Sequence, residues 1–205
     1  MENKTPFMPE IPEKEPQRQQ YFMAHAKEQL HILEENLGRP LTCCINTFGC
    51  QMNARDSEKL LGILETIGYQ AVETEDADFV LYNTCTVREN ANLRVYGRLG
   101  QLGARKKKHP HMMIALCGCM MQEKEVVEKI KKTYRFVDLI FGTHNIFKLA
   151  ELVSLCLEER LEKLEAQGRE DKKPKHKMVV DVWKDTDQIV EDLQVERKYS
   201  VKSGV

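Results

Sequence analysis

The sequence lacks several patterns that would point directly to a function. No apolar run approaches the ~20 residues that a membrane-spanning helix needs, and the first 20 residues hold four prolines and no apolar signal segment. There is no Gly-x-Gly dinucleotide motif, no Gly-Lys-Ser/Thr phosphate loop, no Cys-x2-Cys redox pair and no His-Glu-x2-His zinc motif. We therefore expect a cytoplasmic protein with no membrane partner, outside the commonest nucleotide-binding, dithiol and zinc-protease classes.

An excess of charge of one sign is also missing. The 205 residues include 31 Lys and Arg against 32 Asp and Glu, which gives a formal net charge of −1. This balance excludes a protein that coats nucleic acid through overall positive charge, so any polyanion site must be a local patch. The seven cysteines are an odd number. In a reducing compartment they favour a metal, a redox role or simple burial over a disulfide framework.

Short apolar runs alternate with amphipathic stretches along the chain. This alternation favours an α/β fold with an open, mostly parallel sheet and helices on both faces, in three layers as in flavodoxin or Rossmann folds. Asn53 and Asn145 are predicted to cap two of the helices, and Gly168 is predicted to end the last one. Strands are predicted at residues 41–47, 69–73, 78–83, 112–117, 136–141 and 178–183.

The same pattern predicts three regions. Residues 1–40 form an N-terminal extension that is partly disordered and carries one helix over residues 21–37, closed by Gly38. Residues 41–168 form the α/β domain. Residues 169–205 are rich in charge and are predicted to be a linker that contains one short strand.

Three cysteines lie just after predicted strands. Cys50, Cys85 and Cys119 are separated by 35 and 34 residues, about one strand–helix repeat. In an open parallel sheet the binding crevice lies at the carboxyl ends of the strands, so these three thiols should converge. Grouped thiolates suit zinc or an iron–sulfur cluster. On a 4Fe–4S cluster, three thiolates leave one iron atom without a protein ligand.

Other interpretations of the cysteines remain open. His144 also follows a predicted strand and could complete a Cys3His zinc site with the three cysteines, in a non-catalytic RNA-binding module. Structural zinc sites usually take their ligands as close pairs, which the sequence lacks, and the missing glycine-rich loop disfavours a flavodoxin-like flavin binder. Free cysteine is also commonly buried as a small apolar residue. We interpret four cysteines in this way: Cys43, Cys44, Cys117 and Cys156.

A local basic patch follows the second of these cysteines. No acidic residue occurs from Leu93 to Met121, and the basic residues there recur at near-helical spacing. Such a stripe can neutralise phosphates without reading a sequence. The alternative is a solvated helix end whose cations are stabilised by the helix dipole. The candidate RNA contacts are Arg98, Arg105, Lys106, Lys107 and Lys108.

The strings around the three cysteines resemble the signatures of the tRNA methylthiotransferase family of radical S-adenosylmethionine enzymes. They read Thr-Phe-Gly-Cys-Gln-Met-Asn at residues 47–53, Asn-Thr-Cys-Thr-Val-Arg at residues 83–88 and Gly-Cys-Met-Met-Gln at residues 118–122. In the third string the family more often has Ala before the Gln. A weaker fourth string, Gly-Thr-His-Asn, lies at residues 142–145, and the resemblance covers residues 41–157.

The resemblance implies a transferase that adds a methylthio group to carbon 2 of N6-dimethylallyladenosine at position 37 of tRNA. By motif match, Cys50, Cys85 and Cys119 would hold an auxiliary 4Fe–4S cluster. A radical domain would hold a second 4Fe–4S cluster through Cys-x3-Cys-x2-Cys and use S-adenosylmethionine, and a TRAM domain would help to bind the tRNA. No DNA partner is implied.

One departure from the family is decisive. The sequence contains no Cys-x3-Cys-x2-Cys, and it ends about where the radical domain should begin. We therefore expect the N-terminal part of a longer enzyme, with no catalytic residue of its own. Its expected contribution is the auxiliary cluster, and alone it should be inactive.

Overall fold

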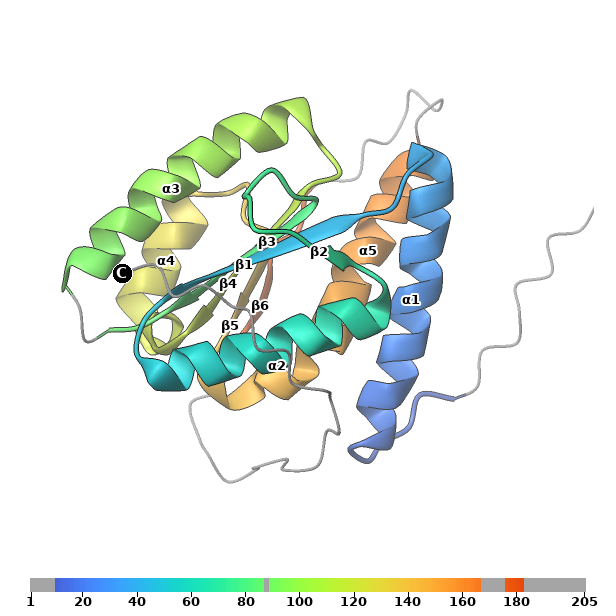
Figure 1. The fold of residues 1–205 in the computed structure, drawn as a ribbon, viewed down its shortest axis with the longest axis horizontal. Coiled ribbons are helices and arrows are strands. Elements are labelled where there is room, and N and C mark those ends of the chain that lie inside the picture. The colour runs from blue at the N-terminus through green and yellow to red at the C-terminus, as the bar shows by residue number, and fades with distance from the viewer. Residues whose placement is uncertain (1–9, 87–88, 167–175, 183–205) are drawn as a thin grey trace, which may run out of the picture.

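Six strands form one parallel sheet in the computed structural model, which describes residues 10–86, 89–166 and 176–182 (Figure 1). The strand order is β2-β1-β3-β4-β5-β6, and every neighbouring pair is parallel. The predicted open α/β sheet is therefore confirmed. The strands are β1 (Thr42–Phe48), β2 (Gln70–Ala71), β3 (Phe79–Thr84), β4 (Met113–Gly118), β5 (Leu139–Phe141) and β6 (Val179–Asp181).

Helices cover both faces of this sheet, as predicted. One core lies between the sheet and α1, α2 and α5, and a second lies between the sheet and α3 and α4 (Figure 1). None of the described helices combines the length and the apolar character needed to cross a bilayer. The helices are α1 (Gln17–Leu37), α2 (Gln51–Ile67), α3 (Glu89–Lys108), α4 (Lys124–Thr133) and α5 (Leu149–Glu165), with 3-10 turns η1 (Cys119–Gln122) and η2 (Thr143–Lys148).

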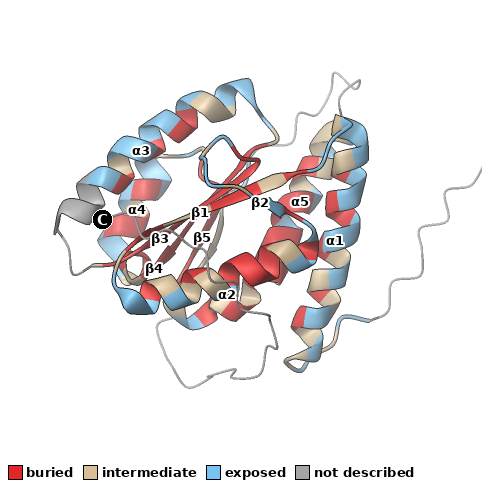
Figure 2. Cartoon of the chain, in the orientation of Figure 1, coloured by how far each residue is buried: buried red, intermediate tan, exposed pale blue. Residues whose placement is uncertain are grey.

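The central strands are buried on both sides, which explains their continuous apolar runs. Figure 2 shows buried residues along the sheet and on the inner helix faces. Successive residues of β1 enter opposite cores: Cys43 packs under α1, α2 and α5, whereas Cys44 packs under α3 and α4. Burial raises the pKa of Cys43 to about 12 and that of Cys44 to about 11. Together with the buried Cys117 and Cys156, they confirm the interpretation of these thiols as core residues.

The N-terminal helix is part of the folded body. α1 begins four residues earlier than predicted and ends at Gly38, which adopts a left-handed conformation with φ 69° and ψ 20°. The guanidinium of Arg18 donates two hydrogen bonds, of 2.7 and 3.1 Å, to the carboxylate of Glu151 on α5. α1 therefore packs beside α5 as an additional helix on that face of the sheet (Figure 1).

Two of the predicted helix caps are wrong. α2 begins at Gln51 with Cys50 as its N-cap, so Asn53 lies in the first turn. Asn145 is fully buried inside η2, and α5 begins only at Leu149. The oxygen of Asn53 accepts the backbone N–H of the N-cap Cys50, while its NH2 group bonds across to β3. The NH2 group of Asn145 donates to the carbonyl of Asp181 on β6. α5 ends at Glu165, and Gly168 lies outside the described residues.

The charged segment after α5 contributes a strand to the sheet. Val179 pairs with Leu139 and Asp181 with Phe141, so β6 extends the sheet beyond β5. Residues 176–182 of the predicted linker therefore belong to the folded body. Residues 167–175 and 183–205 lie outside the described residues, and the division of the chain into three regions stays a prediction.

One buried carboxylate holds the amino ends of two neighbouring strands, β4 and β5. Asp138 is 1% exposed and accepts hydrogen bonds from Arg160 of α5, Lys106 of α3 and the backbone N–H of Ile114. This carboxylate ties α3, α5 and two strands together at the edge of the sheet opposite to the three candidate cysteines.

Candidate metal centre

The three candidate cysteines follow three neighbouring strands. Phe48 of β1 pairs with Thr84 of β3, and Thr84 pairs with Gly118 of β4. Cys85 and Cys119 each come one residue after a member of this row, and Cys50 comes two residues after Phe48. Because neighbouring strands lie only ~4.8 Å apart, the chain brings all three cysteines to one edge of the sheet.

This edge contains the point where the strand order reverses. From β1 the chain moves to β2 on one side, and it then returns to β3 on the other side of β1. In open α/β sheets ligands bind at such a switch point, outside the carboxyl ends of the strands. Cys50 and Cys85 follow the two strands that flank it, so the fold places thiols where a ligand crevice is expected.

The three thiols influence one another. Cys50 is exposed, Cys119 is half-buried and Cys85 is buried. Hydrogen bonds from the backbone at Asn53 and Met52 lower the pKa of Cys50, and a hydrogen bond with the Cys85 side chain acts in the same direction. Burial raises the pKa of Cys119, and the Cys85 and Cys50 thiols raise it further. These pKa effects agree with the strand register, which brings the three cysteines to one edge of the sheet.

Cys50 occupies a position that favours a thiolate. As the N-cap of α2, it faces the backbone N–H of Asn53, while the Asn53 side chain accepts the Cys50 backbone N–H at 3.2 Å. A helix N-terminus stabilises negative charge through its free N–H groups and its dipole. Metal binding requires the Cys50 thiol to lose its proton, and the N-terminus of α2 stabilises the thiolate that results.

Gly118 lets the third strand approach this edge closely. Its φ is +101°, a region that side-chain-bearing residues rarely adopt, and a Cβ would lie 2.1 Å from the carbonyl oxygen of Thr84. The Thr84 hydroxyl donates to the carbonyl of Cys117 at 2.7 Å, and Cys85 N–H donates to the carbonyl of Phe48 at 3.0 Å. These contacts lock the backbone directly before Cys85 and Cys119.

Polar side chains that were not among the predicted site residues lie under the thiols. Asn83 and Ser57 are 1% and 0% exposed, and they are hydrogen-bonded to each other at 3.0 Å. Ser57 also shares a hydrogen bond of 2.7 Å with Thr47. The sequence could have indicated Asn83, because an amide at the end of an otherwise apolar strand must find buried hydrogen-bond partners.

The three thiols are not gathered around a single metal ion among the described residues. Among the described residues, no group of three His, Cys, Asp or Glu side chains is placed to hold one metal ion. Zinc would need every ligand sulfur within about 2.3 Å of one point. A 4Fe–4S cluster instead offers each thiolate a different iron atom, so its ligands form a wider triangle. Thiols are the ligands that iron–sulfur clusters prefer, and the carboxylate of Asp56 also lies near enough to raise the pKa of Cys119.

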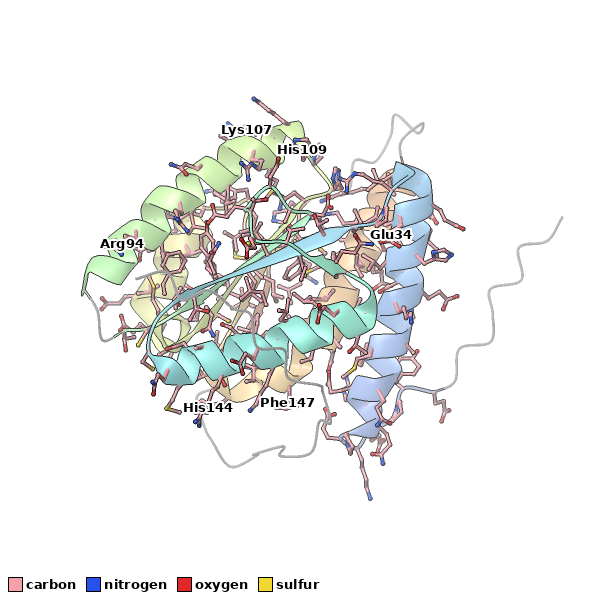
Figure 3. The ribbon with its side chains drawn as sticks, in the orientation of Figure 1. Glu34, Arg94, Lys107, His109, His144 and Phe147 are labelled. Carbon is pink, nitrogen blue, oxygen red and sulfur yellow. The ribbon has the colours of Figure 1, made fainter. Side chains whose placement is uncertain are left out.

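His144 does not complete a four-ligand zinc site. It is exposed on η2, and Figure 3 shows its side chain at the outer surface of the molecule. Because no three-residue metal group that includes it exists among the described side chains, the Cys3His alternative is not favoured.

The candidate RNA contacts lie along α3 in different surroundings. Arg98 is paired with Glu75 at 3.0 Å, and Arg105 lies 3.6 Å from Asp76. Lys106 is mostly buried and is bonded to Asp138 and to the carbonyl of Phe136, which removes its charge from the surface. Two others, Lys107 and Lys108, are exposed at the end of the helix. Figure 3 shows that Lys107 and Arg94 lie toward opposite ends of α3.

Comparison with known proteins finds one family profile and several relatives that share one name. The family profile described as Uncharacterized protein family UPF0004 matches residues 42–142, which span β1 to β5 and all three cysteines. The tRNA-2-methylthio-N(6)-dimethylallyladenosine synthase of Lachnoclostridium phytofermentans is 62% identical over 89% of this chain and 37% of its own length. The proteins of that name in Acetivibrio thermocellus and Clostridioides difficile are 47% and 44% identical, over 92% and 87% of this chain.

These matches cover almost all of this chain but little of the relatives. The chain spans 37%, 36% and 35% of the length of the three proteins named above. An identity of 62% over 183 aligned residues with the Lachnoclostridium phytofermentans protein reflects common descent. The chain belongs to the tRNA methylthiotransferase family.

Proposed function

We propose that this chain is the part of a tRNA methylthiotransferase that holds an auxiliary 4Fe–4S cluster, with Cys50, Cys85 and Cys119 as its protein ligands. One observation carries the proposal. The three thiols closely follow one register row of three adjacent parallel strands, and two of these strands flank the switch point of the sheet. Simple burial does not account for Cys50 and Cys119, because Cys50 is exposed and Cys119 is half-buried, whereas the four cysteines outside the site are buried.

The chain's own residues prepare the site for iron. Thiols bind iron as thiolates, so binding releases protons. The N-cap position stabilises Cys50 in this form, and the strand register brings Cys85 and Cys119 within reach of the same ligand. A bound cluster would supply one iron atom free of protein ligands, open to the sulfur that is inserted.

For the whole protein we propose methylthiolation of carbon 2 of N6-dimethylallyladenosine in tRNA, in the cytoplasm. This follows from the names of the relatives and from the family's motifs around the three cysteines. A second 4Fe–4S cluster and S-adenosylmethionine would act in a radical domain, with a TRAM domain contacting the tRNA.

We propose that α3 contributes to tRNA binding through part of its basic stripe. The helix has 20 residues and spans ~30 Å from its start beside the candidate cluster edge. Arg98, Arg105, Lys107 and Lys108 have exposed or partly exposed cations along it. Lys106 is left out of this surface because its ammonium group is bound to Asp138.

The proposed cluster can be tested on this chain. The protein is purified without oxygen, incubated with ferrous iron and sulfide, desalted, and analysed for iron, acid-labile sulfide and zinc. The proposal predicts about four iron and four sulfide per chain. Zinc without sulfide would contradict it and would restore the single-ion alternative.

A further inference from the structure

We propose that Asn53 and Asn83 act as one positioning unit that sets the spacing of the three thiols. This inference rests on the proposed cluster function, and neither residue is a ligand in it. The unit touches Cys50 directly and touches the residue that precedes each of the other two cysteines.

Asn53 holds Cys50 at two atoms. Its side-chain oxygen Oδ1 accepts hydrogen bonds from the Cys50 backbone N–H at 3.2 Å and from the Cys50 thiol at 3.3 Å. Gly49 leaves the room for this amide, because a Cβ there would lie 2.4 Å from Oδ1. When Cys50 loses its thiol proton, the bond to its backbone N–H remains, so the amide still fixes the position of the ligand.

The same amide reaches the neighbouring strand. Its Nδ2 donates to Oδ1 of Asn83 at 3.0 Å and to the carbonyl oxygen of Thr84 at 3.3 Å. Thr84 directly precedes Cys85. One planar side chain therefore spans the switch point and couples the position of Cys50 to that of Cys85.

Asn83 extends the unit to the third cysteine. Its Nδ2 donates to the backbone carbonyl of Asn53 at 2.8 Å and to Ser57 Oγ at 3.0 Å, so the two amides bond reciprocally. Its Oδ1 lies 2.7 Å from the point that a Cβ of Gly118 would occupy. Gly118 directly precedes Cys119, and the Asn83 oxygen occupies space that a side chain at Gly118 would need, so the pair lies beside the chain at all three ligand positions.

The orientation of both amides is fixed by their partners. Turning the Asn53 amide over would direct its NH2 group at the Cys50 N–H and its oxygen at the oxygens of Asn83 and Thr84. Both side chains are almost completely buried, at 2% and 1% exposure, where an unpaired polar atom is costly. Such fixed partners behind metal ligands orient the ligands, and losing one typically weakens metal binding about 10–100-fold.

Asn53→Asp tests the inference with little change of volume. It replaces Nδ2 by an oxygen that faces the oxygens of Asn83 and Thr84, so the unit must open. Asn83→Asp is the second variant: its new oxygen can accept a hydrogen bond from the Ser57 hydroxyl but faces the backbone carbonyl of Asn53, so the reciprocal bond between the two amides is lost. Ser154→Ala is the matched control: Ser154 of α5 is 3% exposed, and its hydroxyl bonds to Gln29 and His25 of α1 rather than to either asparagine.

The experiment uses the 205-residue chain with the cluster reconstituted without oxygen. It measures the rate of iron loss to a chelator, the electron paramagnetic resonance spectrum of the reduced cluster, and the melting temperature of the metal-free chain. We expect both Asp variants to lose iron at least about tenfold faster and to show an altered spectrum. We expect Ser154→Ala to keep the wild-type spectrum and rate even if its melting temperature falls.

Two results would overturn the inference in distinguishable ways. If the wild-type chain binds the cluster and both Asp variants match it in spectrum and in rate, the positioning role is wrong while the ligand assignment stands. If the wild-type chain binds neither iron nor sulfide, the proposed function fails, and this inference fails with it.

Discussion

Thr84 of β3 and Gly118 of β4 pair so closely that a Cβ on Gly118 would lie 2.1 Å from the carbonyl oxygen of Thr84. The residue after each of them is one of the proposed cluster ligands. The separation of Cys85 and Cys119 is therefore set by the close approach of two backbones, which is stiffer than an approach of two side chains.

Substituting Gly118 by Ala should damage both the fold and the site. The new methyl group meets the Thr84 backbone, and the left-handed φ of +101° adds strain. We expect a loss of about 2–4 kcal/mol in the free energy of unfolding, measured with urea. Gly100→Ala is the control, because nothing lies within 4 Å of its Cβ position on α3 and alanine favours a helix by about 1 kcal/mol. Equal stability of the two variants would contradict this account.

Removing the Asp138 carboxylate should strongly destabilise the protein. Asp138→Ala leaves Arg160, which is 3% exposed, and the mostly buried Lys106 without their shared partner. Breaking a buried ion pair from one side typically costs about 3–5 kcal/mol. Lys131→Ala breaks the exposed pair with Glu128 and should change the unfolding free energy by less than about 1 kcal/mol. A small effect at Asp138 would show that the cluster of charges does not hold the sheet edge.

Acid should weaken the fold through Asp78. Burial would raise the pKa of this carboxyl, but hydrogen bonds from Arg39 and His111 outweigh it and hold the pKa well below its usual range. Its stabilising effect is therefore present above the unfolded-state pKa of about 4 and is lost as the pH falls below that value. Asp78→Asn should be less stable than wild type at pH 7, and the gap in unfolding free energy should narrow progressively below about pH 4. A gap that stays constant down to about pH 2 would rule out this linkage.

Basic residues of α3 should differ in their effect on tRNA binding. The exposed Lys107 and Lys108 are placed to neutralise phosphates, so replacing both by Ala should weaken tRNA binding. The slope of log affinity against log salt concentration should become shallower by about one for each phosphate that is no longer neutralised. Lys106→Met should leave this slope unchanged and reduce stability instead, because Lys106 is bonded to Asp138. Fluorescence anisotropy of labelled tRNA over a range of salt concentrations measures both slopes. Identical slopes for wild type and the double variant would exclude these two lysines.

The architecture could be predicted from the sequence because each central strand is buried on both faces and reads as a continuous apolar run. The predicted first strand at residues 41–47 differs from β1 by one residue at each end. The arrival of Cys50, Cys85 and Cys119 at one edge followed from the rule that parallel strands end together.

What the sequence could not reveal depends on interactions between distant residues. Asparagine is a preferred N-cap, so the pattern favoured Asn53 for that role. In the structure Cys50 is the N-cap, and the Asn53 oxygen accepts the Cys50 backbone N–H from the third helical position. The NH2 group of Asn53 bonds to Asn83 and Thr84, which the sequence pattern did not indicate. Similarly, Lys106 belongs to a basic run in the sequence, but its partner Asp138 lies 32 residues away.

The most direct test of the central claim is the iron and sulfide content of single cysteine variants of the reconstituted chain. Cys50→Ala, Cys85→Ala and Cys119→Ala should each lose most of the about four iron and four sulfide and the brown colour. Cys156→Ala, which changes a buried thiol of α5, should keep them. A full complement of iron and sulfide in all three ligand variants would contradict the account.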